Sequence, residues 1–396
     1  MKVAVLGGFG LMAEAALHDL AADRRVTHIF AADTNLARAK VVLSRIPNAK
    51  KIRAIKIDLT KTAAAARALK GTDSVLNASW YEFNLKAMDL SLALKAHYAD
   101  LGGLYHMTLK QLKRDAEFRR ANLLGALGCG STPGITNMMV ARMSAPFEAI
   151  ETVGIYDASH DPSLSEDSFL PPFSIRTMLA EYEAPAPILL KGRMVDVAAH
   201  SQPEPLEFKE PIGRVTAGTV IHSETATLPD YLKDKKVKNL FFKIVYPESV
   251  KRQLGMLVGM GLSKDKPVRV NGYEVSPRHF VTALAQQSAV TASAQAFTKP
   301  ADYEVLRVRI TGTRHKKPLV KVWDCEIRPT KLLSAGAIGV GFTGSIVSVM
   351  LGHRKSQVGA GVGAPESVLD QDVFFRELKA RKVFSIVETI AHPLAI

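Results

Sequence analysis

The first residues of the chain have the types and spacing needed to hold a dinucleotide. A short apolar run, Lys2 to Leu6, leads into the pattern Gly-x-Gly-x-x-Ala at residues 8–13 and then into helix-forming residues 14–20. Such a turn lets backbone approach a pyrophosphate, and the start of the helix offers unpaired N–H groups and a partial positive charge. The pattern therefore predicts a strand–turn–helix unit that binds a dinucleotide.

Asp33 completes this pattern, because it ends a second apolar run, His28 to Ala32, twenty residues after Ala13. Its carboxylate can accept hydrogen bonds from an adenosine ribose and would repel a 2′-phosphate. We therefore expect NAD as the cofactor, in preference to NADP; the alternative is a glycine-rich turn without a ligand. The residues expected to contact the cofactor are Gly8, Phe9, Gly10, Leu11, Met12, Asp33, Thr34, Asp58, Asn77, Ala78, Ser79 and Gly102.

The overall composition is that of a globular protein with two or three domains. The chain has 396 residues, of which 47% are hydrophobic, so it can bury substantial cores. The first strand follows Met1 directly, without a signal-peptide pattern, and two cysteines are too few for a disulfide framework. These features predict a cytoplasmic protein.

The chain is strongly basic, with a net charge of +14. Basic residues cluster at 233–238 and 314–317, without interleaved aromatic residues or a nucleic-acid-binding motif. We interpret them as a solvated surface that attracts an anionic cofactor and carboxylate substrates, and we expect no nucleic-acid partner. The histidines lack metal-ligand spacing, so no metal is expected.

The first third of the chain alternates between strand and helix patterns. The predicted strands are 2–6, 28–32, 52–57, 73–78, 97–101 and 123–127, and the predicted helices between them are 14–20, 63–69, 85–96 and 109–122. This alternation predicts an α/β fold, with a Rossmann doubly wound parallel sheet whose ligands bind at the carboxyl ends of the strands.

The pattern changes after residue 137. A helix at 138–144 leads to long strand-like segments at 150–156, 188–197, 215–222, 239–246 and 303–311, the last pairing with 318–327 as a hairpin. We therefore expect an inserted α+β domain with a mixed, mostly antiparallel sheet. The expected boundaries are 1–130 for the cofactor domain, 131–333 for the substrate domain and 334–396 for a helical tail, ending in a helix at 373–380, that returns to the cofactor domain.

Residues 335–352 are apolar enough to raise the question of a membrane span. The segment is rich in glycine and serine and is a single late run of this composition. We interpret it as a closely packed buried helix and expect no membrane association; a transmembrane helix is the alternative.

Three motifs resemble the saccharopine dehydrogenase-like family, which includes saccharopine reductases and lysine 6-dehydrogenases. They are Asn-Ala-Ser-Trp-Tyr at 77–81, Asp-Leu-Gly-Gly at 100–103 and Gly-Cys-Gly-Ser-Thr-Pro-Gly-Ile-Thr-Asn at 128–137. The resemblance implies a cofactor domain with an inserted substrate and dimerisation domain, a homodimer, and hydride transfer through an imine at a carbon that bears nitrogen. It also implies an amino-acid substrate, with lysine or saccharopine as the leading candidates.

Two residues near the expected nicotinamide position are candidates for catalysis. Asp100 would hold the substrate amine and stabilise a developing iminium; its alternative role is to cap the next turn. Tyr81 would supply a phenol donor beside Trp80, with core packing of Trp80 as the alternative.

Other candidates line the expected substrate pocket. Cys129 would line the pocket with a small side chain and would not act as a nucleophile. Arg176 matches the position where saccharopine reductases bind a substrate carboxylate, although an arginine on the surface of a helix is equally compatible with the sequence. Thr225 and Thr227 resemble a hydroxyl-bearing substrate loop, but the acidic Glu224 interrupts it and leaves the substrate open.

His222 and Lys243 could transfer protons, and both have a structural alternative. The leading hypothesis is an NAD-dependent oxidoreductase acting on the CH–NH or CH–NH₂ group of an amino acid. Two alternatives stay open: a carboxynorspermidine-type reductive condensation with NADPH, and a non-catalytic sensor of the NAD redox state.

Overall fold

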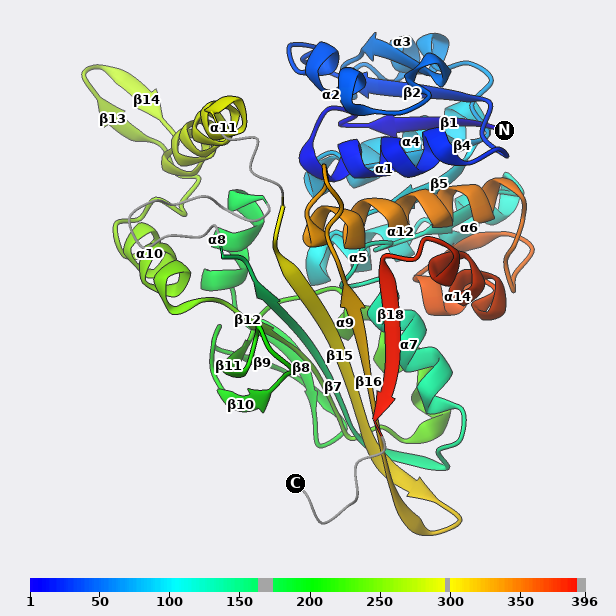
Figure 1. Cartoon of the computed structure of the whole chain (residues 1–396), viewed down its shortest axis with the longest axis vertical. Coiled ribbons are helices and arrows are strands. Elements are labelled where there is room, and N and C mark those ends of the chain that lie inside the picture. Colours follow the sequence, from blue (N-terminus) through cyan, green and yellow to red (C-terminus); the bar gives the residue numbers. More distant parts are fainter. Residues whose placement is uncertain (163–173, 296–299, 390–396) are drawn as a thin grey trace.

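The computed structural model describes residues 1–162, 174–295 and 300–389, which form two β-sheets with helices around them (Figure 1). The first sheet is parallel and the second is mixed and mostly antiparallel, so the predicted α/β fold class is confirmed.

The first sheet has seven parallel strands in the order β17-β6-β5-β4-β1-β2-β3. Its strands are β1 (Lys2–Leu6), β2 (His28–Asp33), β3 (Ile52–Lys56), β4 (Ser74–Asn77), β5 (His97–Asp100), β6 (Leu124–Ala126) and β17 (Gly361–Gly363). Six of them lie where the apolar runs predict strands. The seventh, β17, was not predicted, because a Gly-Val-Gly segment carries too little apolar sequence to indicate a strand.

Helices flank this sheet on both faces. They are α1 (Leu11–Ala22), α2 (Ala39–Arg45), α3 (Thr62–Ala68), α4 (Asn84–Leu94), α5 (Leu104–Leu112) and α6 (Asp115–Arg120). The single helix predicted for 109–122 is wrong, because the chain bends between α5 and α6. Gln111 at the end of α5 bonds inward to Asp100, whereas Asp115 at the start of α6 accepts from Val362 N in β17. The two helices therefore dock on different strands.

The second sheet has nine strands. They are β7 (Ala149–His160), β8 (Ala186–Leu190), β9 (Arg193–Val197), β10 (Glu204–Glu207), β11 (Arg214–Thr219), β12 (Asn239–Val245), β15 (Tyr303–Arg314), β16 (Lys317–Ile327) and β18 (Phe384–Thr389). The main order is β10-β11-β12-β7-β15-β16-β18, with β8 pairing with β12 and β9. The predicted β15–β16 hairpin is confirmed. The single strand predicted for 188–197 is wrong, because Lys191 and Gly192 turn the chain at φ values of 50° and 77°.

The remaining elements lie around the second sheet and at the end of the chain. They are α7 (Ile135–Ser144), α8 (Ile175–Glu183), α9 (Glu224–Tyr231), α10 (Glu248–Gly259), β13 (Val268–Val270), β14 (Tyr273–Val275), α11 (Pro277–Gln295), α12 (Ala335–Gly352), α13 (Pro365–Val368) and α14 (Gln371–Ala380). The tail divides between the sheets: α12 packs on α1, whereas β18 pairs with β16 of the second sheet. The pairing of β18 was not predicted.

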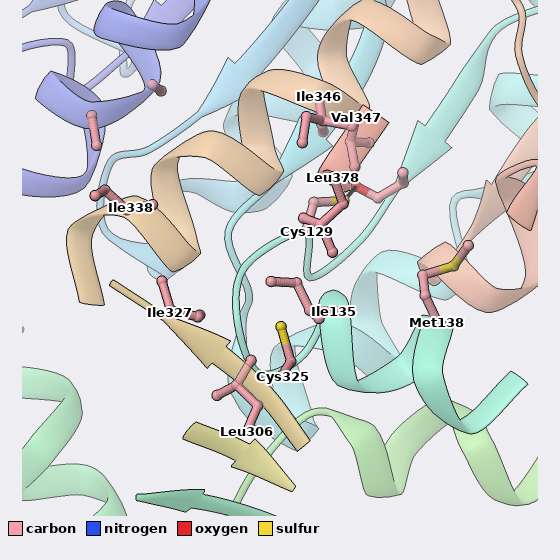
Figure 2. Packing of buried hydrophobic residues seen from close by; sticks show 14 of the residues in the cluster. Cys129, Ile135, Met138, Leu306, Cys325, Ile327, Ile338, Ile346, Val347 and Leu378 are labelled. Atoms are coloured by element: carbon pink, nitrogen blue, oxygen red, sulfur yellow. Dashed lines mark hydrogen bonds between the residues drawn. The ribbon is translucent and has the colours of Figure 1, made fainter. Parts of the chain in front are cut away.

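Helix α12 lies between the two sheets, with α1 on one side and β15 and β16 on the other (Figure 1). Among the described helices it is the one that is long and apolar enough to cross a membrane, and 78% of it is buried inside the protein. A Cβ at Gly339 of α12 would lie 2.8 Å from Ile327 Cδ1 of the second sheet, and Figure 2 shows Ile135 of α7 beside Cys325 of that sheet. In this structure α12 is therefore a core helix that joins the two sheets.

We predict that Gly341→Val destabilises the protein. A Cβ at Gly341 would lie 2.5 Å from Met12 O and 2.6 Å from Ala15 Cβ, so α12 and α1 would have to separate. Overpacking of this kind costs about 1–3 kcal/mol, measurable as a lower urea midpoint. The control is Gly359→Ala, which meets nothing within 4 Å and should leave the midpoint nearly unchanged. An unchanged midpoint for Gly341→Val would show that α12 does not fix the two sheets.

Candidate functional site

The turn after β1 has the geometry of a phosphate cradle. A Cβ at Gly8 would lie 2.9 Å from the backbone of Ala31 and Ala32, so this position has no room for a side chain. A Cβ at Gly10 would meet only Gly7 O, at 3.4 Å. The fold therefore tolerates a side chain at Gly10 better than at Gly8. No side chain caps the start of α1, so its first N–H groups remain available to an anion, next to Leu11 and Met12.

Asp33 is fixed beside this cradle. Its Oδ2 accepts a hydrogen bond from Phe9 N at 3.3 Å, and its Oδ1 accepts from Asn35 N at 3.1 Å and from the Thr34 hydroxyl. A cavity of about 420 Å³ lies at the ends of β2 and β3, and its lining includes Thr34, Asp58, Lys56 and Lys61. The cavity lies beside Asp33, where the adenosine half of a dinucleotide is expected.

The segment after β4 lies against the glycine turn. Asn77 Oδ1 accepts from the backbone N–H and the hydroxyl of Ser79, at 3.2 and 2.6 Å, and a Cβ at Gly7 would lie 2.8 Å from the Ser79 backbone. Asn77, Ala78 and Ser79 thus lie next to residues 7–10, as the carboxyl-end rule predicts. Asn77 Nδ2 also donates to Asn84, which donates to Gly102 O at 3.2 Å.

Asp100 is oriented toward the protein interior. It is 1% exposed, and its carboxylate accepts hydrogen bonds from the side chains of Gln111 and Tyr98 and from Gly102 N and Gly128 N, at 2.6–3.0 Å. Burial raises its pKa despite these donors. With its oxygens occupied in this way, Asp100 holds the turns after β5 and β6 in place, so we treat it as a positioning residue rather than as a partner of the substrate amine.

Cys129 is also inside the protein, with no exposed surface. Its N–H donates to Asp100 O at 2.7 Å, and burial raises the pKa of the thiol well above its usual value. The thiol is therefore kept neutral, which agrees with a contribution of shape rather than of a nucleophile.

Tyr81 and Arg176 lie at the entrance between the two domains. Tyr81 lines a cavity of about 460 Å³ together with Ala180, Ile221 and Arg278, which come from the second domain. The Arg176 guanidinium lies over the Trp80 ring, 3.2 Å from its centroid, and Arg176 Nε has no hydrogen-bond partner among the described residues. An arginine stacked on an aromatic ring can still bind a carboxylate.

The two threonines expected in a substrate loop have partners within the protein. Thr225 donates to His222 O at 3.0 Å, and Thr227 donates to Glu366 Oε1 at 2.7 Å. Both are buried, and Thr227 connects α9 to α13. The structure therefore places them behind the pocket, where they support α9.

His222 and Lys243 lie on opposite faces of the second sheet. His222 stacks on Phe242, with ring centroids 4.0 Å apart, whereas the next residue in β12, Lys243, points the other way and binds Glu204 at 2.8 Å. Alternation along a strand enforces this separation. Lys243 therefore belongs to an ion-pair network with Arg309 on the outer face, away from His222.

The face that carries His222 also carries carboxylates that the sequence analysis did not single out. Glu224 bonds to His222 Nδ1, Asp157 lies on β7 and accepts from Thr132, and Glu181 lies on α8 and accepts from Tyr246 at 2.7 Å. Glu304 shares this face, since it lies two residues before Leu306, the partner of Asp157. For Asp157 and Glu304 the signal available in the sequence was an acidic residue within an otherwise apolar strand, whereas Glu181 and Glu224 lie in helices and carry no such signal.

Ser131, after β6, brings the first domain to this acidic cluster. Ser131 Oγ and Glu304 Oε2 both lie within 3.1 Å of the position that a Cβ at Gly339 in α12 would occupy, so the two side chains meet on one side of this helix. A hydrogen bond from Ser131 lowers the pKa of the Glu304 carboxyl, against the larger opposing effect of burial. The acidic cluster, defined as Asp157, Glu181, Glu224 and Glu304, therefore faces the end of the parallel sheet.

Burial and mutual repulsion raise the pKa of three carboxyl groups, those of Asp157, Glu181 and Glu304. Burial raises the pKa of Asp157 to about 6 and that of Glu181 to about 7, and it raises the pKa of Glu304 well above its usual value. Burial opposes the charged form of His222, but the carboxylates of Glu224, Glu181 and Asp157 outweigh it and raise the pKa of the imidazole. A histidine with these properties can exchange protons near neutral pH.

Comparison with known proteins finds a matching family model for each of the two domains. Residues 3–124 match the family model of the saccharopine dehydrogenase NADP binding domain, and residues 130–383 match that of the saccharopine dehydrogenase C-terminal domain. The two domains and the dinucleotide cradle are those of an oxidoreductase. The chain belongs to the saccharopine dehydrogenase family.

Individual relatives are distant. Carboxyaminopropylagmatine dehydrogenase from Synechocystis sp. is 22% identical over 304 residues, which are 73% of each chain. Saccharopine dehydrogenase (L-Glu forming) from Saccharomyces cerevisiae has a TM-score of 0.74 at 16% identity, covering 99% of this chain and 100% of that one. Homospermidine synthase from Legionella pneumophila, solved with NAD, has a TM-score of 0.68 at 11% identity, covering 98% and 91%. The two structures share the fold.

We predict that Asp100→Asn lowers the free energy of unfolding by about 1–3 kcal/mol, because an amide cannot accept from all four donors and leaves buried groups unpaired. Urea denaturation measures the loss, and Asp372→Asn, whose side chain is 84% exposed, is the control. Full stability together with lost turnover would instead assign Asp100 to the substrate.

Proposed function

We propose that the protein transfers hydride between a nicotinamide dinucleotide and a carbon bonded to nitrogen in a cationic amine, through an imine. The observation that carries this proposal is the acidic cluster with His222, in the second domain and next to Ser131 of the first. In a chain with a net charge of +14, three carboxylates around one histidine, with Glu304 beside Asp157, are an exception that a positively charged ligand would stabilise.

The entrance of the site carries positive charge, opposite in sign to that of the acidic cluster. Arg176 and Arg278 lie near Tyr81 at the mouth of the interdomain cavity, where their guanidinium groups suit a carboxylate. A substrate with an amine at one end and a carboxylate at the other matches both regions. This charge pattern supports an amino acid, or an amino-acid conjugate of an amine, as the substrate.

The names of the relatives favour a reductive condensation over simple oxidation of lysine. Carboxyaminopropylagmatine and homospermidine are amines with several cationic groups, and the acidic cluster offers several carboxylates to such a compound. We therefore propose that the amine partner is a diamine or guanidine-bearing amine, joined to a carboxylate-bearing aldehyde. Cleavage or formation of saccharopine is the second form of the same C–N chemistry.

The residues can be assigned roles in this reaction. The cofactor supplies or accepts the hydride when bound, with its phosphates at residues 8–11 and its ribose at Asp33. Glu224 holds His222 Nδ1, which leaves Nε2 to give a proton to the departing hydroxyl when the imine forms, or to take one from the amine in reverse. Asp157 and Glu304 would stabilise the iminium charge.

For cofactor choice we propose NAD, because Asp33 is held in place at the expected ribose. Lys56 and Lys61 line the same cavity and would reduce the penalty for a 2′-phosphate. Use of NADPH at a lower kcat/KM is therefore expected rather than complete rejection.

The test is to incubate the purified protein with NADH or NADPH, a carboxylate-bearing aldehyde such as aspartate semialdehyde, and an amine, while following loss of the reduced cofactor. We expect diamines and guanidine-bearing amines to give turnover with NADH above that with glutamate or ammonia. Oxidation of lysine and of saccharopine with NAD is measured in parallel. Binding of NADH without turnover of any amine would support a sensor of NAD redox state instead.

Replacing His222 tests its proton-transfer role. We predict that His222→Asn lowers kcat by about 100- to 10,000-fold while cofactor binding persists. The control is His315→Asn, whose side chain is 77% exposed. Near-wild-type turnover of His222→Asn would exclude the role.

A pH profile separates proton transfer from packing. In the reductive direction the protonated imidazole is the active form, so the rate should fall as pH rises through the pKa of His222. Glu224→Gln removes the carboxylate that most raises this pKa, so the falling limb should move to lower pH. If the falling limb of the pH profile lies at the same pH in Glu224→Gln as in the natural protein, the titrating group is not His222.

A further inference from the structure

Three basic turns that are far apart in the sequence lie together at one end of the second sheet. They are residues 191–193 between β8 and β9, 233–238 before β12, and 314–317 at the turn between β15 and β16, and we name them together the basic end. Gly192 N donates to Lys238 O at 2.8 Å, which joins the first turn to the second. Each turn by itself is a short basic segment, so the combined surface is a product of the fold.

The start of β7 joins the second turn to the third. Phe147 O, just before β7, accepts a hydrogen bond from Lys235 Nζ at 2.7 Å. The next residue, Glu148, accepts a hydrogen bond from Lys316 N and lies 3.4 Å from His315 Nδ1. Because these contacts fix the turns to the sheet and to one another, the basic end is one continuous surface.

The basic end carries much of the positive charge of the chain. Its three turns contain nine lysine and arginine residues against one aspartate, and Glu148 and Glu151 contact it from β7 and the residue before β7. Nine positive side chains and three carboxylates leave a net charge of +6, out of +14 for the whole chain. Seven of the nine are exposed and form no ion pair with a carboxylate among the described residues: Lys191, Arg193, Lys233, Lys236, Arg314, Lys316 and Lys317.

The basic end lies far from the acidic cluster and from the cofactor cradle. Thr313 of β15 pairs with Ala149 at the basic end, whereas Leu306 pairs with Asp157 of the acidic cluster. The strand between these two pairs spans about 23 Å at the usual rise per residue. In Figure 1 the β15–β16 turn lies at the bottom of the molecule and the first sheet at the top. Contact with an anionic cofactor or substrate therefore does not account for the basic end.

Aliphatic side chains lie beside the basic ones and indicate the chemistry of a partner. On the β8–β9 hairpin Leu190, Met194 and Val195 are 37%, 41% and 36% exposed, next to Lys191 and Arg193. An anionic bilayer combines phosphate groups, which attract lysine and arginine, with an acyl boundary that accepts aliphatic side chains. A nucleic acid offers phosphates and bases, but the three turns contain no phenylalanine, tyrosine or tryptophan to stack on a base.

We propose that the basic end docks this protein on the surface of an anionic membrane. The lysine and arginine side chains contact lipid phosphates at all three turns, and the aliphatic side chains of the β8–β9 hairpin enter the boundary with the acyl chains. From the sequence we expected no membrane association, because each basic segment is small by itself. Docking at this end keeps the interdomain cavity, which lies toward the first domain, facing away from the bilayer.

The experiment measures cosedimentation of the full-length protein with phosphatidylcholine vesicles, prepared with and without an equal share of phosphatidylglycerol. We expect binding to the vesicles that contain phosphatidylglycerol, and its loss in concentrated NaCl, because salt screens exposed charges. The triple variant Lys191→Glu/Lys236→Glu/Lys316→Glu reverses one charge in each turn and should bind these vesicles at least about 100-fold more weakly.

The matched control is Lys110→Glu/Lys113→Glu/Arg120→Glu, which makes the same change of net charge at exposed positions around α5 and α6. It should bind the anionic vesicles as the natural protein does, and urea denaturation checks that both triple variants are folded. Equal loss of binding in the two triple variants would show attraction by net charge alone and would overturn the proposal. So would binding of the natural protein to a DNA duplex but not to the anionic vesicles.

A fluorescent label locates the contact independently. Cys129 and Cys325 are both free and buried, so a thiol-reactive, polarity-sensitive dye would label the exposed cysteine of Met194→Cys. Anionic vesicles should shift the emission of this dye to shorter wavelength and leave it unchanged in Leu109→Cys, at an exposed position of α5. An unchanged emission in Met194→Cys, or equal shifts in the two variants, would overturn the proposal. None of these readouts depends on catalytic activity.

Discussion

The contact of α12 with both sheets is the constraint on which the rest of the structure depends. Gly341 lets α12 lie against the backbone of α1, and Gly339 on the same helix lies against Ile327 of the second sheet. Because one rigid helix touches both layers, the carboxyl ends of the parallel strands and the inner face of the second sheet meet at a fixed separation. The end of α12 near Gly339 lies where Ser131 and Glu304 meet, so the packing that stabilises the fold also builds the site.

In this arrangement the acidic cluster is buried inside a protein whose surface is basic. Most basic side chains of the chain lie at its surface, and the acidic cluster lies inside, where low dielectric strengthens each interaction. The raised pKa values of Glu181 and Glu304 favour their neutral forms, which lowers the cost of burying them, and a cationic ligand would favour their charged forms. Under the proposed function, binding of an amine would therefore release protons, which fits a reaction in which an amine must lose its proton before it attacks a carbonyl carbon.

Much of the first domain could be predicted from sequence, because apolar runs of parallel strands and the glycine turn are local signals. The strand β17 and the break between α5 and α6 could not, since a three-residue Gly-Val-Gly strand forms only through its neighbour β6. The same limit applies to the site. Gly8, Asp33 and Ser79 follow from position along strands, whereas the meeting of Asp157 with Glu304 depends on the β7–β15 register, which pairs residues far apart in the chain.

The contrast between Asp100 and His222 shows why the position of a residue in a motif does not by itself establish its role. Both are buried polar residues near the ends of strands, and Asp100 belongs to the motif that most clearly marks the family. Yet the Asp100 carboxylate already accepts four hydrogen bonds from within the protein, so it has little capacity left for a ligand. His222, in contrast, is hydrogen-bonded to Glu224 through one ring nitrogen, and its other ring nitrogen stays available. A group that must exchange protons needs unfilled hydrogen-bonding capacity as well as a suitable pKa. By that criterion we propose that proton transfer belongs to the second domain, and that the turn around Asp100 in the first domain is the frame that would hold the cofactor against it.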